Sequence, residues 1–533
     1  MKKAPLTFEQ TQALHQAGDL EAAEAGYLTL LKKSPRSIDI LHALSILFVQ
    51  QQQYEKAINL LQQAIHYHPQ HPVLYLHLAN TFKAMRSFPE AKKALEHAIQ
   101  LNPNYSAALN NLGTIYFAEG KLNEAIHHFR QALQKQSDYP DAYYNLGLAL
   151  AKQNALGEAI HVFETLIHFA PQYAAAYFQL GCLLMRQEKM LEAIDCFLSL
   201  EKMAPQHIET QINLATCHLK QGDDNQAKKH YLQALEHTPG DTQILFNLGI
   251  IYMRQGDIDR AIQQYQRVAQ LDPDHFAAHN NLGVALLNKQ NVGLALQHFQ
   301  TALRLQPENE AICYTVKMLT QDKRLLAAPS DYIKNLFDAY ADHYEPHLLM
   351  SLEYQVPQLL LHAVKKTISP FSSPSWDILD LGCGTGLCGR PFKPFAKTLT
   401  GVDLSEKMLD IARQKNIYDH LIVDDITHFL THKKNTYELI VAGDVFIYIG
   451  DLKPLFLTLA DSLQSHGMLV FNSEVTENDP FVLNQSGRFA HHKNYIDQLA
   501  NQHHFTIVHY QMNVTRMQNN EPVYGHVYVL KRL

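Results

Sequence analysis

The sequence predicts a multidomain chain of two fold classes, an all-α superhelix of repeats followed by an α/β domain with a largely parallel sheet. Two observations predict this division. Prolines recur at multiples of 34 residues through the first 307 residues, and from Trp376 onward short apolar strands alternate with helices. The length of 533 residues agrees, because it exceeds what one ordinary hydrophobic core holds.

Three columns of residues define the repeat. Prolines close the units at positions 35, 69, 103, 171, 205, 239, 273 and 307, with Ser137 in the missing place. Alanines form the second column: Ala23, Ala57, Ala91, Ala125, Ala159, Ala193, Ala227, Ala261 and Ala295. Small residues form the third: Ser45, Ala79, Gly113, Gly147, Gly181, Ala215, Gly249 and Gly283. Small side chains let two antiparallel helices approach closely, and proline ends the second helix of each pair.

With this period and these columns, residues 1–307 resemble a tetratricopeptide repeat array of nine helical hairpins, which stack into a superhelix with a groove. Residues 308–330 are expected to form a capping helix and a linker, because Ala328-Pro329-Ser330 breaks the helical pattern. A second domain is expected over residues 331–533.

A column of amides stands two residues before the small position, about 200° around the helix from it and so away from the partner helix. Its asparagines are Asn111, Asn145, Asn213, Asn247 and Asn281. The column is similar to the asparagine ladder of the O-linked N-acetylglucosamine transferase repeats, and this resemblance implies a groove that binds extended peptide through amide hydrogen bonds. The alternative is that asparagine at this position only faces water.

Seven strands are expected in the second domain. Five apolar runs alternate with helices and indicate a parallel sheet: WDILDL, KTLTGVD, HLIVDD, YELIVAG and HGMLVFNS. The last two strands, 505–514 and 523–530, are joined by a turn too short for a crossover, so they must form an antiparallel hairpin. Helices are expected before the sheet, over 331–366, and a loop over 369–375.

The loop ILDLGCGTGLCG, residues 378–389, follows the first strand and contains two overlapping motifs. G-x-G-x-x-G favours a dinucleotide, and D-x-G-x-G-x-G favours S-adenosylmethionine. Asp380 would repel a pyrophosphate but attract an ammonium and a sulfonium. Asp403 ends the second strand, where an acid binds ribose hydroxyls, and Asp425 follows the third, where an acid accepts from an adenine amino group. The short remaining chain completes one sheet and leaves no second catalytic domain for a dehydrogenase.

These residues resemble the class I S-adenosylmethionine-dependent methyltransferases, whose fold is a seven-stranded Rossmann-like α/β domain. The resemblance implies S-adenosyl-L-methionine as the cofactor, and Cys383 is expected to contribute only its backbone. The implied cofactor-binding positions are Asp380, Gly382, Cys383, Gly384, Gly386, Asp403, Leu404, Met408, Asp425, Ile426, Gly443 and Tyr340.

The helix FDAYADHYE, residues 337–345, resembles the opening of small-molecule methyltransferases of biotin and quinone synthesis. In those enzymes the tyrosines lie over the cofactor as a lid, which implies this role for Tyr340 and Tyr344. The alternative is that both rings pack on the sheet. The fusion of repeats to this domain also resembles a bacterial group of tetratricopeptide-repeat methyltransferases.

The acceptor site is expected at the carboxyl edge of the sheet. We expect His491 to act as general base, Arg488 to hold a carboxylate or phosphate, and Asp444 to face the acceptor. The alternative is that Arg488 and His491 only order their loop. The sequence AGDVF after the fourth strand lacks an N-P-P-Y-like turn, so methylation of adenine N6 or of glutamine is not expected.

Composition excludes other classes of protein. Net charge is −7 with scattered lysine and arginine, so no nucleic-acid partner is expected. No run of about 18 apolar residues predicts a membrane span, and the N-terminus lacks the apolar core of a signal peptide. The six cysteines and 31 histidines show no metal or disulfide spacing, which suits the reducing cytoplasm and predicts no metal site. The oligomeric state is left open.

Three functions follow from the sequence. The first is a methyltransferase whose repeats recruit a protein or peptide. The second is a small-molecule methyltransferase whose repeats form a scaffold for an oligomer or a partner. The third is an interaction protein whose methyltransferase fold has no catalytic role.

Overall fold

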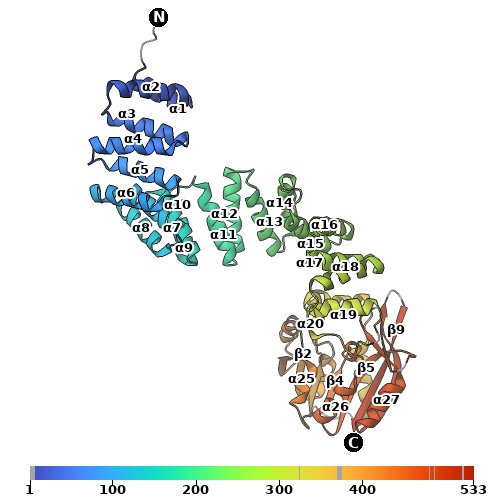
Figure 1. Cartoon of the computed structure of the whole chain (residues 1–533). Coiled ribbons are helices and arrows are strands. Elements are labelled where there is room, and N and C mark those ends of the chain that lie inside the picture. The colour runs from blue at the N-terminus through green and yellow to red at the C-terminus, as the bar shows by residue number, and fades with distance from the viewer. Residues whose placement is uncertain (1–5, 323, 369–374, 479, 485, 519–520) are drawn as a thin grey trace. The chain divides into compact units, whose positions relative to one another are not determined.

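The computed structural model describes residues 6–322, 324–368, 375–478, 480–484, 486–518 and 521–533 (Figure 1). It divides the chain into two compact units, Met1–Ile244 and Leu245–Leu533. This division falls within the repeats, and the expected boundaries at 307 and 330 stay predictions. Of the expected loop 369–375, all but Ser375 lies outside the described residues.

The first unit consists of antiparallel helix pairs, as the 34-residue period predicts. Its first helices mostly have 13 residues and its second helices 14, and tight turns join them. The helices are α1 (Phe8–Gln16), α2 (Leu20–Lys33), α3 (Ile38–Gln50), α4 (Tyr54–Tyr67), α5 (Pro72–Ala84), α6 (Phe88–Leu101), α7 (Ser106–Ala118), α8 (Leu122–Lys135), α9 (Pro140–Lys152), α10 (Leu156–Phe169), α11 (Ala174–Arg186), α12 (Met190–Met203), α13 (Ile208–Lys220) and α14 (Asp224–His237).

The small-residue column sets how closely the paired helices approach. A methyl group added at Gly147 would come within 2.5 Å of the Phe163 ring on the partner helix. The same glycine-on-ring contact recurs in four more repeats: Gly113 on Phe129, Gly181 on Phe197, Gly249 on Tyr265 and Gly283 on Phe299. Each ring fills the space that a side chain would otherwise take, so close packing of each pair requires both the glycine and the aromatic residue.

The amide column joins the first helices of successive repeats. Asn111 in α7 donates its side-chain N–H to the Asn80 amide oxygen in α5 at 2.8 Å. Asn145 in α9 donates to the Asn110 oxygen in α7 at 3.0 Å. Asn213 lies 3.7 Å from the Cys182 sulfur, and Asn247 and Asn281 are half-buried. Each amide carries two N–H donors and an acceptor oxygen, so these bonds leave capacity for a peptide. Peptide binding at this column stays a prediction.

The second unit begins with the last repeats and continues into the α/β domain. The remaining repeat helices are α15 (Thr242–Arg254), α16 (Ile258–Leu271), α17 (Phe276–Asn288), α18 (Val292–Leu305) and α19 (Glu310–Leu319). After the linker come α20 (Ser330–Tyr340), η1 (Ala341–His343), α21 (Tyr344–Pro346), η2 (His347–Ser351) and α22 (Val356–Thr367).

Within the described residues the sheet has nine strands, in the order β3-β2-β1-β4-β5-β7-β6, and β9 pairs with both β5 and β8. The strands are β1 (Trp376–Leu381), β2 (Ala396–Asp403), β3 (His420–Val423), β4 (Tyr437–Ala442), β5 (Leu463–Val475), β6 (Phe481–Leu483), β7 (Phe489–His491), β8 (Phe505–Gln518) and β9 (Glu521–Arg532). The five parallel strands and the terminal hairpin are confirmed, and the short strands β6 and β7 extend the expected seven.

Helices cover both faces of this sheet (Figure 1). On one face α25 (Ile426–Thr431), α26 (Lys453–Ser462) and α27 (Lys493–Gln502) pack against Leu379 and Leu381. On the other, α22 and α23 (Gly389–Phe392) pack against Ile378, the residue before Leu379. The remaining short elements are η3 (Lys393–Phe395), α24 (Glu406–Gln414) and η4 (Phe446–Tyr448). Alternate side chains of β1 are thus buried on opposite faces of the sheet. The carboxyl ends of the strands are left to form the site.

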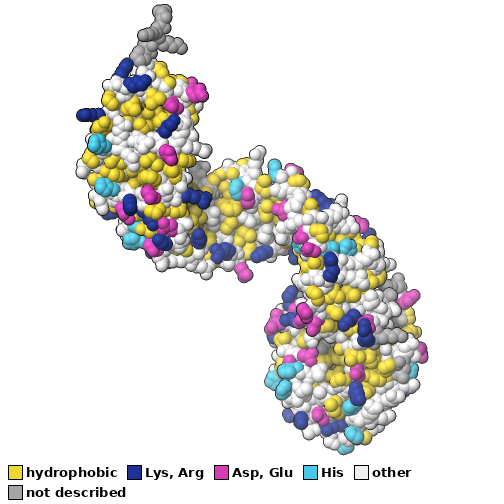
Figure 2. All heavy atoms as spheres, viewed as in Figure 1, with side chains coloured by type: hydrophobic (Ala, Val, Ile, Leu, Met, Phe, Trp, Pro, Cys, Tyr) yellow, Lys and Arg dark blue, Asp and Glu magenta, His cyan; other side chains and the backbone are white. Residues whose placement is uncertain are grey.

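The surface carries no concentration of one charge on the face drawn in Figure 2, where basic and acidic side chains are interspersed. Among the described residues no helix is long and apolar enough to cross a membrane. Nor do three or more histidine, cysteine or acidic side chains of the described residues gather as metal ligands would.

We predict that Gly147→Ala destabilises the repeats by about 1–3 kcal/mol, because the new methyl group overlaps the Phe163 ring. Chemical unfolding of the full chain, followed by helical circular dichroism, measures this. Gly157→Ala is the matched control, since Gly157 is exposed on α10 and has no heavy atom within 4 Å of the added group. The control should be neutral or stabilising by up to about 1 kcal/mol. Equal effects of the two substitutions would contradict the close-packing explanation.

Candidate functional site

A cavity of about 490 Å³ lies at the carboxyl edge of the sheet. The ends of parallel strands meet at this edge, so residues far apart in sequence come together there. Of the sequence-predicted cofactor positions, these line it: Gly382, Gly384, Asp403, Leu404, Asp425, Ile426, Gly443 and Tyr340. The other four, Asp380, Cys383, Gly386 and Met408, are not in the lining.

The glycine loop has the backbone conformation that its sequence requires. Gly382, Gly384 and Gly386 have φ angles of +60°, +51° and +90°, which favour glycine. A methyl group at Gly384 would find nothing closer than the Tyr344 ring at 4.0 Å, so this position faces the open cavity. At Gly386 it would lie 3.0 Å from Tyr418, on the protein side of the loop. Gly384 therefore faces the cavity, whereas Gly386 packs against the rest of the domain.

Asp403 connects the end of β2 to the glycine loop. One carboxylate oxygen accepts from the Gly384 N–H at 2.8 Å, and the other accepts from the Ser405 N–H at 2.9 Å. Burial raises the pKa of Asp403, and these backbone donors oppose the rise. Each carboxylate oxygen has a further lone pair, so the group can also accept from hydroxyls in the cavity.

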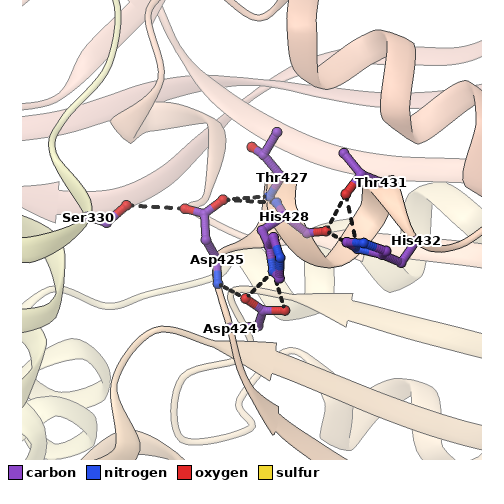
Figure 3. Close-up of polar contacts among 7 residues, drawn as sticks. All are labelled: Ser330, Asp424, Asp425, Thr427, His428, Thr431 and His432. Atoms are coloured by element: carbon purple, nitrogen blue, oxygen red, sulfur yellow. Dashed lines mark hydrogen bonds and ion pairs between the residues drawn. The ribbon is translucent and has the colours of Figure 1, made fainter.

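Asp425 caps helix α25 and contacts the start of α20 (Figure 3). Its Oδ1 accepts from the N–H groups of Thr427 and His428 at 2.9 and 3.2 Å. Its Oδ2 accepts from the Ser330 hydroxyl at 3.2 Å, across the cavity rim. The neighbouring Asp424 bonds the His428 ring instead, at 2.8 Å. Asp425 therefore presents one oxygen toward the cavity, shared with Ser330.

Asp380 is almost fully buried behind the glycine loop. The Tyr418 hydroxyl donates to its Oδ2 at 2.6 Å, and its Oδ1 has no hydrogen-bond partner among the described residues. Burial raises the pKa of Asp380 to about 7, against the lowering effect of Tyr418. A buried carboxyl with an unpartnered oxygen fits a nearby cationic group, which would favour its ionised form.

Asp444 and Arg488 face the cavity from the other side of the glycine loop. Asp444 follows β4 with a φ of +56°, and the Asn472 side chain donates to its Oδ1 at 2.6 Å. The Asp444 N–H donates back to the Asn472 oxygen at 2.8 Å, so β5 fixes this turn. Arg488 precedes β7, and its positive charge opposes the rise that burial gives to the pKa of Tyr448.

His491 does not line the cavity, and this corrects the expectation that it acts as general base. The residue is fully buried in β7, and its Nε2 donates to the carbonyl oxygens of Ile449 and Gly450 at 2.9 and 3.1 Å. Burial lowers its pKa to about 4. Since Nε2 carries the proton and Nδ1 is buried without a partner among the described residues, His491 holds the 446–450 segment in place.

The linker supplies a wall that sequence reasoning missed. Leu326, Ala327 and Ala328 line the cavity, and Ala327 forms an antiparallel bridge with Ile449. The Leu326 carbonyl accepts from the N–H groups of residues 450 and 451 at 2.7 and 2.9 Å. The Ala328 N–H donates to the Tyr448 carbonyl at 2.8 Å. Three small or aliphatic residues before a proline carry no signal of this role.

The lid-like helix does lie at the cavity. Tyr340 and Tyr344 both line it, with ring centroids 5.6 Å apart in an edge-on arrangement. His347, also in the lining, bonds the Tyr340 hydroxyl. Sequence reasoning missed His347, although its spacing of seven from Tyr340 is the spacing of one helix face.

Comparison with known proteins assigns both parts of the chain. A methyltransferase-domain model matches residues 379–471, which contain the end of β1, the glycine loop and strands β2 to β4. Tetratricopeptide repeat models match residues 48–114, 113–154, 140–173, 174–207, 206–274 and 246–310. The chain carries tetratricopeptide repeats and a methyltransferase domain.

The methyltransferase domain has relatives of low similarity. A malonyl-[acyl-carrier protein] O-methyltransferase of Serratia marcescens is 42% identical over 55 residues, which is 10% of this chain and 22% of that protein. A ubiquinone biosynthesis O-methyltransferase of Bartonella tribocorum is 24% identical over 121 residues, 22% of this chain and 49% of that protein. The chain thus spans at most about half the length of these relatives.

The repeats have relatives among solved structures. The crystal structure of YrrB, described as a TPR protein with an unusual peptide-binding site, is 25% identical and has a TM-score of 0.33. The match covers 36% of this chain and 97% of YrrB.

We predict that Asp380→Asn stabilises the ligand-free methyltransferase domain above pH 7 by at least about 1 kcal/mol. The folded-state pKa of about 7 lies above the ordinary 3.8, so the stability that the protonated carboxyl contributes falls as the pH rises from about 4 to about 7. Thermal unfolding of the full chain at pH 5.5 and 8.5 should show a gain for the variant at both pH values that is larger at pH 8.5, by about 2 kcal/mol. Asp410→Asn, at an exposed carboxylate on α24, is the control. A variant that is less stable than the wild type at pH 8.5 would contradict this account.

Proposed function

We propose that this chain is an S-adenosyl-L-methionine-dependent methyltransferase whose repeat array recruits a protein or peptide as substrate or partner. One observation carries the cofactor assignment. The Asp403 carboxylate accepts from the Gly384 N–H, so the ribose-binding acid and the glycine loop are held together at the cavity. A glycine loop that served only as a tight turn would not need an acid fixed beside it.

The residues present fit the cofactor. Asp403 would bind the ribose hydroxyls and Asp425 the adenine amino group, and the open face at Gly384 would take the methionine part. The unpartnered Oδ1 of buried Asp380 fits a positively charged group nearby. Bound S-adenosylmethionine supplies a methyl group on a positively charged sulfur.

The chain's own contribution is to orient the acceptor and exclude water. Phe337, Tyr340 and Tyr344 line the cavity from the helical segment, and their rings displace solvent from it. Asp444, Tyr448 and Arg488 face the same cavity from beyond β4 and β5. The Asn472 amide donates to the Asp444 carboxylate and holds it in this orientation.

Two observations bear on the substrate. The amide column of the repeats keeps unused hydrogen-bonding capacity, which favours recruitment of an extended peptide. The second candidate, a small-molecule methyltransferase with the repeats as scaffold, is favoured by the aromatic cover of the cavity and by relatives that are named O-methyltransferases. The third candidate, an interaction protein without catalysis, leaves the buried acids behind the glycine loop unexplained.

We expect S-adenosylmethionine to bind the full chain and to bind Asp403→Asn at least about 10-fold more weakly, because an amide cannot accept from both ribose hydroxyls and the loop. Isothermal titration measures both. Asp410→Asn should bind like the wild type. If the folded wild type binds no cofactor, the interaction-protein candidate becomes the better one.

Cofactor binding should also release protons at pH 6. Asp380 is largely protonated there, since its pKa is about 7, and a cationic ligand group lowers that pKa and favours the carboxylate. Titration in two buffers of different ionisation enthalpy should give up to about one proton released at pH 6 and almost none at pH 8.5. Proton uptake at pH 6 would contradict the placement of a cation near Asp380.

A further inference from the structure

The described residues of the cavity lining include four aspartates but one arginine or lysine, Arg488. Asp403 ends β2 and Asp425 follows β3, whereas Arg488 precedes β7, which pairs with β5. In the strand order, β1, β4 and β5 separate β2 and β3 from β7. A ligand group that contacts Arg488 is therefore remote from the nucleoside.

A buried cluster supports Arg488 from behind. Glu474 in β5 accepts from the Arg516 guanidinium at 2.5 Å and from the Asn484 amide at 3.2 Å. Arg516 is 2% exposed, so this pair is out of water. Arg488 lies 3.8 Å from the same Glu474 oxygen, beyond hydrogen-bond distance. One carboxylate thus serves two guanidinium groups, and the cluster of three keeps a net positive charge.

The Arg488 guanidinium also has N–H donors available to a ligand in the cavity. Its side chain is 24% exposed, and its charge opposes the rise that burial gives to the pKa of the nearby Tyr448. A guanidinium carries five N–H donors in a planar fork that matches a carboxylate. Tyr448 lines the same cavity, and its O–H can donate to the same ligand group. The surrounding lining is apolar, with Phe337, Ile447 and Leu348.

We propose that the methyl acceptor carries a carboxylate and that Arg488, with Tyr448, binds it. This assignment rests on the proposed methyltransferase function and names its substrate class. A monoanion fits better than a phosphate dianion, because Asp444 and Asp451 line the same cavity and repel additional negative charge. The carboxylate can belong to a small organic acid or to a peptide.

The test compares carboxylic acids with their primary amides on the full chain saturated with S-adenosylhomocysteine. One arm uses phenylacetate, hexanoate and cinnamate, and the other uses short peptides with a free or amidated C-terminus. Isothermal titration should show at least one acid that binds about 10-fold more tightly than its amide. The arm that shows this preference identifies the source of the carboxylate. No preference in either arm would overturn the proposal.

Variants of Arg488 assign the preference to this residue. Arg488→Gln should bring acid and amide to within about 3-fold of each other, and Arg488→Lys should keep an intermediate preference because it retains charge but not the planar fork. Arg413→Gln, at an exposed arginine on α24, should keep the full preference. An undiminished preference in Arg488→Gln would overturn the proposal.

Binding of S-adenosylhomocysteine separates this proposal from the one on which it rests. Arg488→Gln and Arg488→Lys should both bind S-adenosylhomocysteine like the wild type, which also shows that they are folded. A wild-type chain that does not bind it would overturn the proposed function and this assignment together. A chain that binds it but does not prefer acids would overturn this assignment alone.

Discussion

Backbone pairing between the linker and the segment after β4 is the contact on which the second unit depends. Residues 326–328 exchange hydrogen bonds with residues 448–451, each contributing about 0.5–1.5 kcal/mol net. The same linker lines the cavity, and Ser330 at its end bonds Asp425. On the repeat side, the Tyr314 hydroxyl of α19 donates to the Gly487 carbonyl at 3.0 Å, next to Arg488. Helix α19 is therefore joined to the cavity wall by two contacts, the Tyr314 bond to Gly487 and the backbone pairing of residues 326–328.

Asp380 and Asp403, the two acids beside the glycine loop, favour ligand binding at a cost to folding. Burial raises the pKa of both Asp380 and Asp403, so ionising them costs free energy in the ligand-free protein. An apolar residue would remove this cost. A cationic ligand offsets the cost of ionisation by favouring the charged form. Ligand binding therefore explains the two carboxyl groups, whereas packing alone does not. Perturbed acids gathered at one cavity are typical of a functional site.

Periodic and local patterns made much of the fold predictable. The 34-residue columns fix the helix pairs because each glycine contacts a ring in its own unit, as Gly147 contacts Phe163. The strand-end acids were predictable because parallel strands bring Asp403 and Asp425 to one edge. Strand β7 was not predictable, since three residues carry no alternation, and it is the pairing of β7 with β5 that buries His491. The cavity wall at Ala327 was missed for a similar reason, because its role depends on a long-range bridge to Ile449.

The charged cluster beside the cavity is hard to explain by stability. A buried ion pair such as Glu474 with Arg516 gains little over apolar residues of the same volume, because both charges lose their hydration. Its geometry has a different consequence. With Glu474 bonded to Arg516 and Asn484, that carboxylate cannot draw Arg488 into a close pair, and the Arg488 guanidinium stays 3.8 Å away at the cavity wall. Arg516 thus keeps Arg488 available to a ligand. The buried pair of Glu474 and Arg516 is explained by its role in holding Arg488 at the cavity wall.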